Sequence, residues 1–319
     1  MNDTRRALLR ALADGPVTGP QLASDLGVSR AAVWKQVEGL REEGFEVVGG
    51  DDGYAVASVP EYGGAAVEFG LDAPFAVEFH DSLPSTNDRA RELAAEGRED
   101  VVVVADEQTG GRGRLSREWN SPSGGVWASV LTRPRLPPAH APLYTLAAAV
   151  AVTRAARGVG VDASIKWPND VMVDDAKLAG VLTEMEGEAD RISWLIVGVG
   201  VNANVDPDSL PAGATSLRAE VGDVTRSEFL QRALTAFDTL TADPDAILDA
   251  WREHAATLGR RVRVETPTGV VEGRAVGVRF PGALVVETED AGGEYDGHAG
   301  RSGGEVTIHA GDCEHLRPV

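Results

Sequence analysis

The sequence predicts a multi-domain protein of the mixed α/β (α+β) class, made of three successive units. Its 319 residues are too many for one ordinary hydrophobic core. Its hydrophobic content of 43% is typical of a globular chain. The spacing of apolar residues changes twice along the chain, which predicts a small helical domain at 1–60, a mixed domain at 75–258 and a small β-domain at 259–319.

The first unit is expected to contain three helices and a hairpin. The helices should cover residues 4–13, 21–26 and 29–43, and the two strands residues 45–48 and 54–57. The order helix, helix–turn–helix, hairpin is typical of a winged helix.

The third expected helix is a candidate DNA-recognition helix. Its residues Val33, Val37 and Leu40 repeat at i, i+4 and i+7, so they should face the core. The residues expected to point outward toward DNA are Ser29, Arg30, Trp34 and Lys35. Residues 1–60 carry 6 basic and 9 acidic residues, so attraction to DNA phosphates should be weak. The alternative role is domain packing or dimerisation.

The second and third units differ in their expected elements. Apolar runs predict buried strands at 101–105 and 194–201, and helices are expected at 85–97, at 141–157 and within 226–258. Residues 60–74 are expected to form a Gly-rich linker with a short connecting segment. From residue 259 onward, short alternating segments predict a small β-barrel with strands at 261–265, 269–275, 283–287 and 305–308, and with a polar insertion at 292–304.

The net charge of −20 predicts a soluble protein and suits a high-salt cytoplasm, where salt screens self-repulsion. We take a halophilic source as a hypothesis, with an ordinary acidic protein as the alternative. The single cysteine, Cys313, permits no intrachain disulfide and favours a reducing, cytoplasmic location. Neither a signal-peptide core nor an apolar run long enough for a membrane span is present.

A segment rich in glycine and arginine follows the first expected buried strand. It runs from Gln108 to Arg117, and its glycines allow a backbone to approach an anion closely. Arg112, Arg114 and Arg117 add positive charge, so the segment is a candidate phosphate or carboxylate site. A solvated basic loop is the alternative. The Gly-Lys-Ser/Thr ending of a P-loop is missing.

A second motif contains two of the three lysines of the chain, which otherwise uses 27 arginines. Lys166 begins Lys-Trp-Pro-Asn-Asp, and Lys177 begins Lys-Leu-Ala-Gly. A compact ammonium at these places suits charge neutralisation in phosphate chemistry, and Asp170 is a candidate Mg²⁺ ligand. The alternative is a surface turn with ion pairs.

Two further motifs complete the set. Gly198 and Gly200 leave room for a ligand against a buried strand, and Asn202 behind them offers a donor and an acceptor. The alternative is a strand with a bend. The triplet Ser-Thr-Asn that begins at Ser85 offers polar side chains, although its default role is a helix cap.

Together, these four motifs resemble those of the biotin–protein ligases in their order and rough spacing, most strongly over residues 85–202. The flanking units resemble the bifunctional ligase–repressor form. The resemblance implies a central mixed sheet related to class II synthetases and a C-terminal SH3-like barrel. It also implies that ATP and Mg²⁺ convert biotin to biotinyl-5'-AMP, from which biotin passes to a lysine of a biotin carboxyl carrier protein.

The resemblance assigns roles to individual residues. Biotin would contact Ser85, Thr86, Asn87, Gln108, Gly111, Arg112, Gly113, Arg114, Lys177, Gly198 and Gly200. The nucleotide would contact Arg114, Arg117, Trp119, Asn169 and Asn202. Catalysis would depend on Arg112, Lys166, Asp170 and Lys177, with Asp170 near Mg²⁺. One departure stands out, because Ser116 replaces the glycine that many members carry.

Two other functions stay open. A lipoate–protein ligase shares the fold and the chemistry, and a biotin-sensing transcription factor would bind the ligand without releasing pyrophosphate. The expected partners are the carrier protein, operator DNA and a second copy of the chain in a homodimer.

Overall fold

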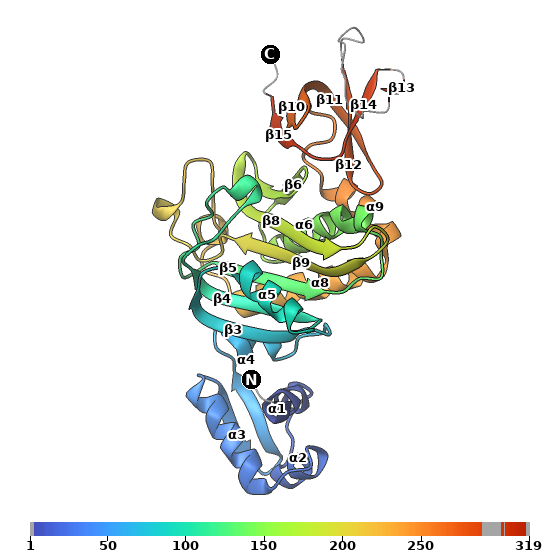
Figure 1. Ribbon diagram of the computed structural model, residues 1–319. Coiled ribbons are helices and arrows are strands. Elements are labelled where there is room, and N and C mark those ends of the chain that lie inside the picture. The colour runs from blue at the N-terminus through green and yellow to red at the C-terminus, as the bar shows by residue number, and fades with distance from the viewer. Residues whose placement is uncertain (1–2, 289–300, 303, 317–319) are drawn as a thin grey trace.

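The computed structural model describes residues 3–288, 301–302 and 304–316, and arranges them as three units in chain order (Figure 1). Within these ranges, no helix is long and apolar enough to cross a membrane. The expected polar insertion at 292–304 lies largely outside the described residues.

The first unit consists of three helices and an antiparallel hairpin, as expected. Its elements are α1 (Asp3–Ala13), α2 (Gly19–Asp25), α3 (Arg30–Glu42), β1 (Glu46–Gly50) and β2 (Gly53–Ser58). Ser29 caps α3 by accepting a hydrogen bond from the Ala32 amide at 3.2 Å. Val33, Val37 and Leu40 are buried in the small core of this unit, which confirms the inward face predicted for α3.

The central unit is a seven-stranded mixed sheet in the order β3-β4-β5-β9-β8-β7-β6. Only β3 and β4 run parallel. The strands are β3 (Ala76–Leu83), β4 (Val101–Gln108), β5 (Val126–Thr132), β6 (Ala163–Lys166), β7 (Asp170–Val173), β8 (Ala176–Gly187) and β9 (Ile192–Val201). The buried strands expected at 101–105 and 194–201 are therefore the inner strands β4 and β9.

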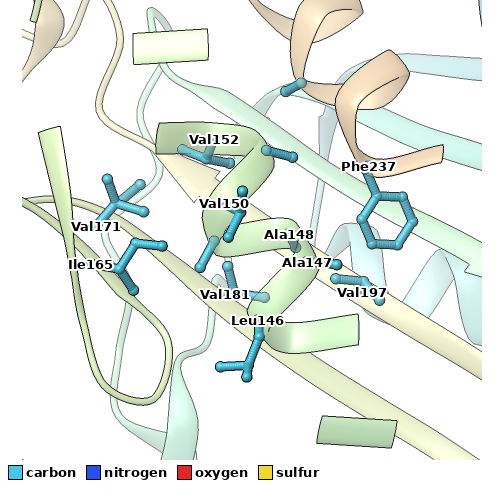
Figure 2. Close-up of a cluster of buried hydrophobic side chains, with 14 of the residues drawn as sticks. Leu146, Ala147, Ala148, Val150, Val152, Ile165, Val171, Val181, Val197 and Phe237 are labelled. Atoms are coloured by element: carbon cyan, nitrogen blue, oxygen red, sulfur yellow. The ribbon is translucent and has the colours of Figure 1, made fainter. Parts of the chain in front are cut away.

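Helices cover both faces of this sheet. The Ala-rich α6 (Ala141–Gly158) is buried along most of its length against one face, and Phe237 of α8 (Arg226–Ala242) lies beside it (Figure 2). The break expected near Asp243 separates α8 from α9 (Pro244–His254). On the opposite face, α5 (Thr86–Ala95) packs on residues of β4, β5 and β9.

Short segments complete the central unit. The expected linker contains α4 (Gly64–Glu68), whose residues are mostly buried, and α7 (Leu217–Val221) precedes α8. Glu61 in the same linker pairs with the buried Arg226 at 2.8 Å, which anchors the linker to α8. The segment is therefore packed structure and not a free connector.

The third unit is a six-stranded sheet in the order β13-β14-β12-β11-β10-β15. Its strands are β10 (Arg261–Thr266), β11 (Gly269–Arg279), β12 (Ala283–Glu287), β13 (Arg301–Ser302), β14 (Glu305–Ile308) and β15 (Asp312–His315). The expected strands are present, but β13 and β15 were not predicted, because β13 has only two residues and β15 has a single apolar residue, Cys313, among polar ones. Trp167 ties this sheet to the central unit by donating to the Gly282 carbonyl at 2.9 Å.

Candidate active site

One cavity of about 280 Å³ opens beside the N-terminus of α5. The predicted site residues that line it are Ser85, Thr86, Asn87, Gln108, Arg112, Gly113, Arg114, Arg117, Trp119, Asn169, Asp170, Lys177, Gly198 and Gly200. These residues come from segments that are far apart in the sequence. The ends of α5, β4, β7, β8 and β9 bring them together. Three predicted residues, Gly111, Lys166 and Asn202, lie outside this lining.

The glycines of β9 permit the convergence. A Cβ atom on Gly198 would lie 2.3 Å from Oδ1 of Asn87, and one on Gly200 would lie 2.8 Å from Nε1 of Trp119. Any larger residue would therefore displace groups that line the cavity. This geometry is consistent with the prediction that Gly198 and Gly200 leave space beside the backbone of β9.

Neutral polar groups lie at one end of the cavity, which we call the polar end: Thr86, Asn87 and Gln108 line the cavity, and the buried Ser121 and Ser129 bond to them from outside its lining. The Thr86 amide and hydroxyl donate to Oε1 of Gln108 at 2.8 and 3.1 Å. Gln108 in turn donates from Nε2 to Ser121 at 3.0 Å. Ser129 lies 2.6 Å from Oδ1 of Asn87 and 2.7 Å from the Thr86 hydroxyl. The polar end is thus a connected network in which every member except the half-buried Gln108 is buried.

Cations form the other end, which we call the charged end: Arg112, Arg114, Arg117 and Lys177. Arg112 pairs with Asp88 at 2.6 Å, and its guanidinium lowers the pKa of that carboxyl below its ordinary value. Lys177 lies 2.6 Å from Asp170 and 5.0 Å from the centre of the Trp119 ring.

The remaining arginines of the charged end reach the C-terminal unit. Arg114 donates to Asn169 at 3.0 Å and to the Gly311 carbonyl at 2.8 Å, and Arg117 pairs with Asp312. Every cation of the charged end therefore has a protein partner in this structure.

The loop that carries these arginines is strained. Leu115 and Ser116 have φ angles of 55° and 57°, which lie in the left-handed region that favours glycine. Ser116 thus adopts the conformation that glycine takes most readily. The Leu115 side chain is 75% exposed, so the loop tip is held by few contacts.

The three predicted residues outside the main lining have other surroundings. Lys166 lines an adjacent cavity of about 180 Å³, which shares Arg114, Arg117 and Asp170 with the first. Asn202 is buried and donates to the Thr215 carbonyl at 3.0 Å. Gly111 is buried beneath the loop, where its carbonyl accepts from the Trp119 amide at 3.0 Å.

The sequence analysis missed several residues of the site and its immediate surroundings, among them Asp88, Ser121, Ser129, Glu184 and Asp312. Ser129 is fully buried in the middle of β5, where only its polarity among apolar neighbours could have marked it. Glu184 accepts from Nδ2 of Asn87 at 2.7 Å, across 97 positions of the sequence. No local pattern could have connected these two residues.

Comparisons with known proteins agree with this geometry. The Biotin/lipoate A/B protein ligase family matches residues 79–202, an HTH domain matches 4–63 and the Biotin protein ligase C terminal domain matches 257–316. Bifunctional ligase/repressor BirA of Bacillus subtilis (strain 168) is 38% identical over 292 residues, covering 86% of this chain and 90% of the relative.

Two further comparisons support the same family. The biotin–[acetyl-CoA-carboxylase] ligase of Paracoccus denitrificans is 35% identical over 216 residues, covering 63% of this chain and 90% of the relative. A structure of the biotin protein ligase from Aquifex aeolicus in complex with biotin and ATP matches with a TM-score of 0.61 at 26% identity, covering 75% of this chain and 99% of that one. The chain therefore belongs to the biotin protein ligase family, in the bifunctional form that carries an N-terminal helix-turn-helix domain.

Proposed function

We propose that this chain joins biotin to ATP as biotinyl-5'-AMP and then transfers biotin to a lysine of a biotin carboxyl carrier protein. The observation that carries the proposal is the position of Lys177, inside a cavity that has a neutral polar end and a cationic end. A ligand with a polar head and a carboxylate fits such a cavity with its head among the neutral groups. Its carboxylate then reaches the cations.

The polar end would hold the ureido head of biotin. Ser85, Thr86, Asn87 and Gln108 offer hydrogen-bonding groups, and Gly198 and Gly200 form the wall behind the ring. Specific polar recognition of this kind is strong because an analogue without the matching groups leaves buried partners unpaired.

The charged end would hold the adenylate. We assign Gly111, Arg112, Gly113 and Arg114 to the loop that wraps its phosphate and carboxylate. We assign Arg117, Trp119, Asn169 and Asn202, together with Arg114, to the nucleotide. Nε1 of Trp119 is buried without a partner among the described residues, so a ligand acceptor would satisfy it. The buried side chain of Asn202 makes its assignment an indirect one, through the shape of the cavity wall.

The reaction proceeds in two substitutions. A biotin carboxylate oxygen attacks the α-phosphorus of ATP, and the bond to the β-phosphate breaks to release pyrophosphate. The deprotonated amine of the acceptor lysine then attacks the acyl carbon, and AMP leaves. In the first step Arg112, Lys166 and Lys177 offset the negative charge that separates the two reactants and develops in transfer.

Asp170 fits a role near Mg²⁺, because magnesium in nucleotide sites is usually held by one or two carboxylates with phosphates and water. Asp170 lines both cavities, the first together with Lys177 and the second together with Lys166. The bound ion would neutralise phosphate charge, and Asp170 would also orient Lys177 through their 2.6 Å contact.

Incorporation of labelled biotin into a carrier domain tests the proposal. Label should appear on the carrier only when ATP is present, with release of one pyrophosphate for each biotin. Calorimetric titration with biotin and with lipoate separates the biotin ligase from a lipoate ligase. Biotin binding without pyrophosphate release would indicate a non-catalytic sensor.

We propose that the N-terminal unit binds operator DNA, through the exposed face of α3. Ser29, Arg30, Trp34 and Lys35 are all exposed on this helix, and Trp34 is 57% exposed. Arg5 and Arg6 are less suited to DNA than their charge suggests, because they pair with Glu43 and Glu68. A gel shift on DNA upstream of biotin uptake or synthesis genes, with and without biotin and ATP, tests this role.

Further assignments follow from the same proposal. We take the units as 1–60, 75–258 and 259–319, with a central sheet of the class II synthetase type and a C-terminal sheet of the SH3-like barrel type. We also propose a cytoplasmic, halophilic protein that forms a homodimer when the adenylate is bound. Sedimentation of the protein with and without biotin and ATP tests the dimer.

A further inference from the structure

The turn between β6 and β7 carries several of the groups that we assign to the nucleotide. Lys166 and Asp170 face each other across this hairpin, and Trp167, Pro168 and Asn169 connect them. Asn169 and Asp170 line the main cavity, and all five residues line the adjacent one. The position of this turn therefore decides where these groups lie.

The strand that leads into the turn lies at the edge of the central sheet. β6 pairs with β7 on one side only, so the sheet does not hold its other side. The segment that follows α9 covers this side: the Ala256 amide donates to the Ile165 carbonyl at 2.8 Å, and Ala255 bridges to Ile165 in parallel. The outer side of β6 therefore depends on residues 255–257, which lead to the third unit.

Thr257, the last residue of this segment, extends the contact to the turn itself. The Trp167 amide donates to the Thr257 hydroxyl oxygen at 2.9 Å, across 90 positions of the sequence, and Thr257 is 0% exposed. A backbone N–H that is buried away from water needs an acceptor, because leaving it unpaired costs free energy. The Thr257 hydroxyl supplies this acceptor just beyond the end of β6.

The third unit holds both this hydroxyl and the Trp167 ring. Nε2 of His315, in β15, lies 3.0 Å from the Thr257 hydroxyl oxygen. The contact is a hydrogen bond whichever ring nitrogen carries the proton, because a hydroxyl both donates and accepts. The Trp167 ring donates from Nε1 to the Gly282 carbonyl at 2.9 Å. Trp167 is thus fixed at its backbone and at its side chain.

A displacement of Trp167 would pass to the cations of the site. Only Pro168, whose ring fixes its φ angle, separates Trp167 from Asn169. Asn169 accepts from Arg114 at 3.0 Å, and the next residue, Asp170, pairs with the lysine of the charged end at 2.6 Å. Movement of the turn would therefore disturb both of these cations.

We propose that Thr257 is a positioning residue for the adenylation step. Through the Trp167 amide, it holds the turn at the place where Asn169 and Asp170 meet the nucleotide. Thr257 lines neither cavity, so it acts through Trp167 and not by contact with the reacting groups. The inference rests on the proposed function, because that function assigns the nucleotide to this turn.

Replacement of the hydroxyl tests this role. Thr257→Val keeps a β-branched side chain but removes the acceptor, whereas Thr257→Ser retains the acceptor. Single-turnover pyrophosphate release by the full chain, at saturating biotin and increasing ATP, gives the second-order rate constant for ATP. We expect Thr257→Val to lower this constant by about tenfold or more, as the loss of a buried hydrogen-bond partner does. Thr257→Ser should stay close to the wild type.

Biotin binding provides the contrasting measurement. The calorimetric Kd for biotin should stay within about twofold in both variants, because other elements build the polar end. A fold that was merely destabilised would weaken both substrates together. The expected split between ATP and biotin therefore separates positioning of the turn from general damage.

Thr153→Val is the matched control for loss of a buried hydroxyl. Thr153 is also 0% exposed, and its hydroxyl donates to the Ala149 carbonyl inside α6 at 2.8 Å. This variant should lower Tm and leave the rate constant for ATP unchanged. His315→Ala is a second test at a half-buried position. It keeps the acceptor but removes the group that orients it, so the rate constant should fall by about two- to fivefold.

Several results would overturn the inference alone: a wild-type rate constant for ATP in Thr257→Val, an equal loss in Thr257→Ser or Thr153→Val, or an equal loss of biotin affinity. If Thr257→Val does not fold, a wild-type rate constant in His315→Ala would overturn it. If the wild-type chain released no pyrophosphate from ATP in the presence of biotin, the proposed function itself would fail.

Discussion

The two ends of the cavity satisfy their polar groups in different ways. At the polar end, neutral groups that are at most 5% exposed, such as Asn87 and Ser129, bond to one another. At the charged end, partly or fully exposed cations pair mostly with carboxylates, and the Arg117 side chain that pairs with Asp312 is 66% exposed. The first network is buried and directional, whereas the second is open to solvent.

This difference indicates what each end must do when a ligand arrives. The polar end is preorganised, so it loses little freedom on binding and can discriminate between heads. The cations of the charged end must leave their protein carboxylates to bind the anionic groups of the ligand. Solvent-exposed ion pairs contribute little free energy, so breaking them costs little. We therefore expect the polar end to determine which acid binds and the charged end to determine how fast it reacts.

The largest effect should come from Lys177→Ala, which removes the ammonium between the reacting groups. Loss of one such electrostatic stabiliser typically lowers the rate by about 10²–10³. Single-turnover formation of biotinyl-5'-AMP measures it, and biotin affinity should fall much less. Arg232→Ala, which removes an exposed cation on α8, serves as the control. Adenylate formation above half of the wild-type rate in Lys177→Ala would contradict the assignment.

Gly198→Ala should disturb the opposite end of the cavity. The added Cβ would lie 2.3 Å from Oδ1 of Asn87 and would force that side chain out of its network. Loss of a buried hydrogen-bond partner costs about 1–3 kcal/mol, so the biotin Kd should rise by about 10- to 100-fold. Gly277→Ala is the matched control, because a Cβ on that strand glycine meets nothing within 4 Å. Equal affinities in the two variants would show that the polar end tolerates displacement.

Arg112→Gly should affect retention of the intermediate more than its formation. Without the guanidinium, the loop loses its attachment to Asp88 and its contact with a bound adenylate. We expect the adenylate to dissociate about tenfold faster, a loss typical of one charge-assisted bond, and to label nearby lysines without selectivity. Arg191→Gly, which breaks a comparable exposed pair with Glu188, should change nothing. Dissociation at the wild-type rate would argue against this role of Arg112.

Salt should produce the smallest effect. It should change stability through the acidic surface and leave the ligand selectivity of the polar end unchanged. Raising KCl from about 0.1 to 1 M shortens the Debye length from about 10 to about 3 Å and screens the net charge of −20. We expect Tm to rise by a few degrees, equivalent to about 1 kcal/mol. The lipoate-to-biotin affinity ratio should stay constant, because the polar end is neutral and mostly buried. A falling Tm would refute the halophilic hypothesis.

Much of the architecture could be predicted because its signals are local. Helix caps depend on residues within one turn, so Ser29 and Ser85 were recognisable as caps and cap α3 and α5 in the structure. Continuous apolar runs likewise identified β4 and β9 as inner strands. The strands β3, β5, β7 and β8 of the central sheet, and the short β13 and β15, escaped prediction because strand pairing depends on partners that are distant in the sequence.

The sequence by itself determined which segments carry the chemistry, because glycine-rich loops, lysine placement and polar triplets are properties of neighbouring residues. Only the tertiary structure decided how these segments are held. It joined Asn87 to Glu184 and Arg117 to Asp312 across 97 and 195 positions, and it turned Asn202 toward Thr215. The physical reason is that a hydrogen bond depends on distances between atoms in space, and the folded sheet sets those distances for residues that are far apart in the chain.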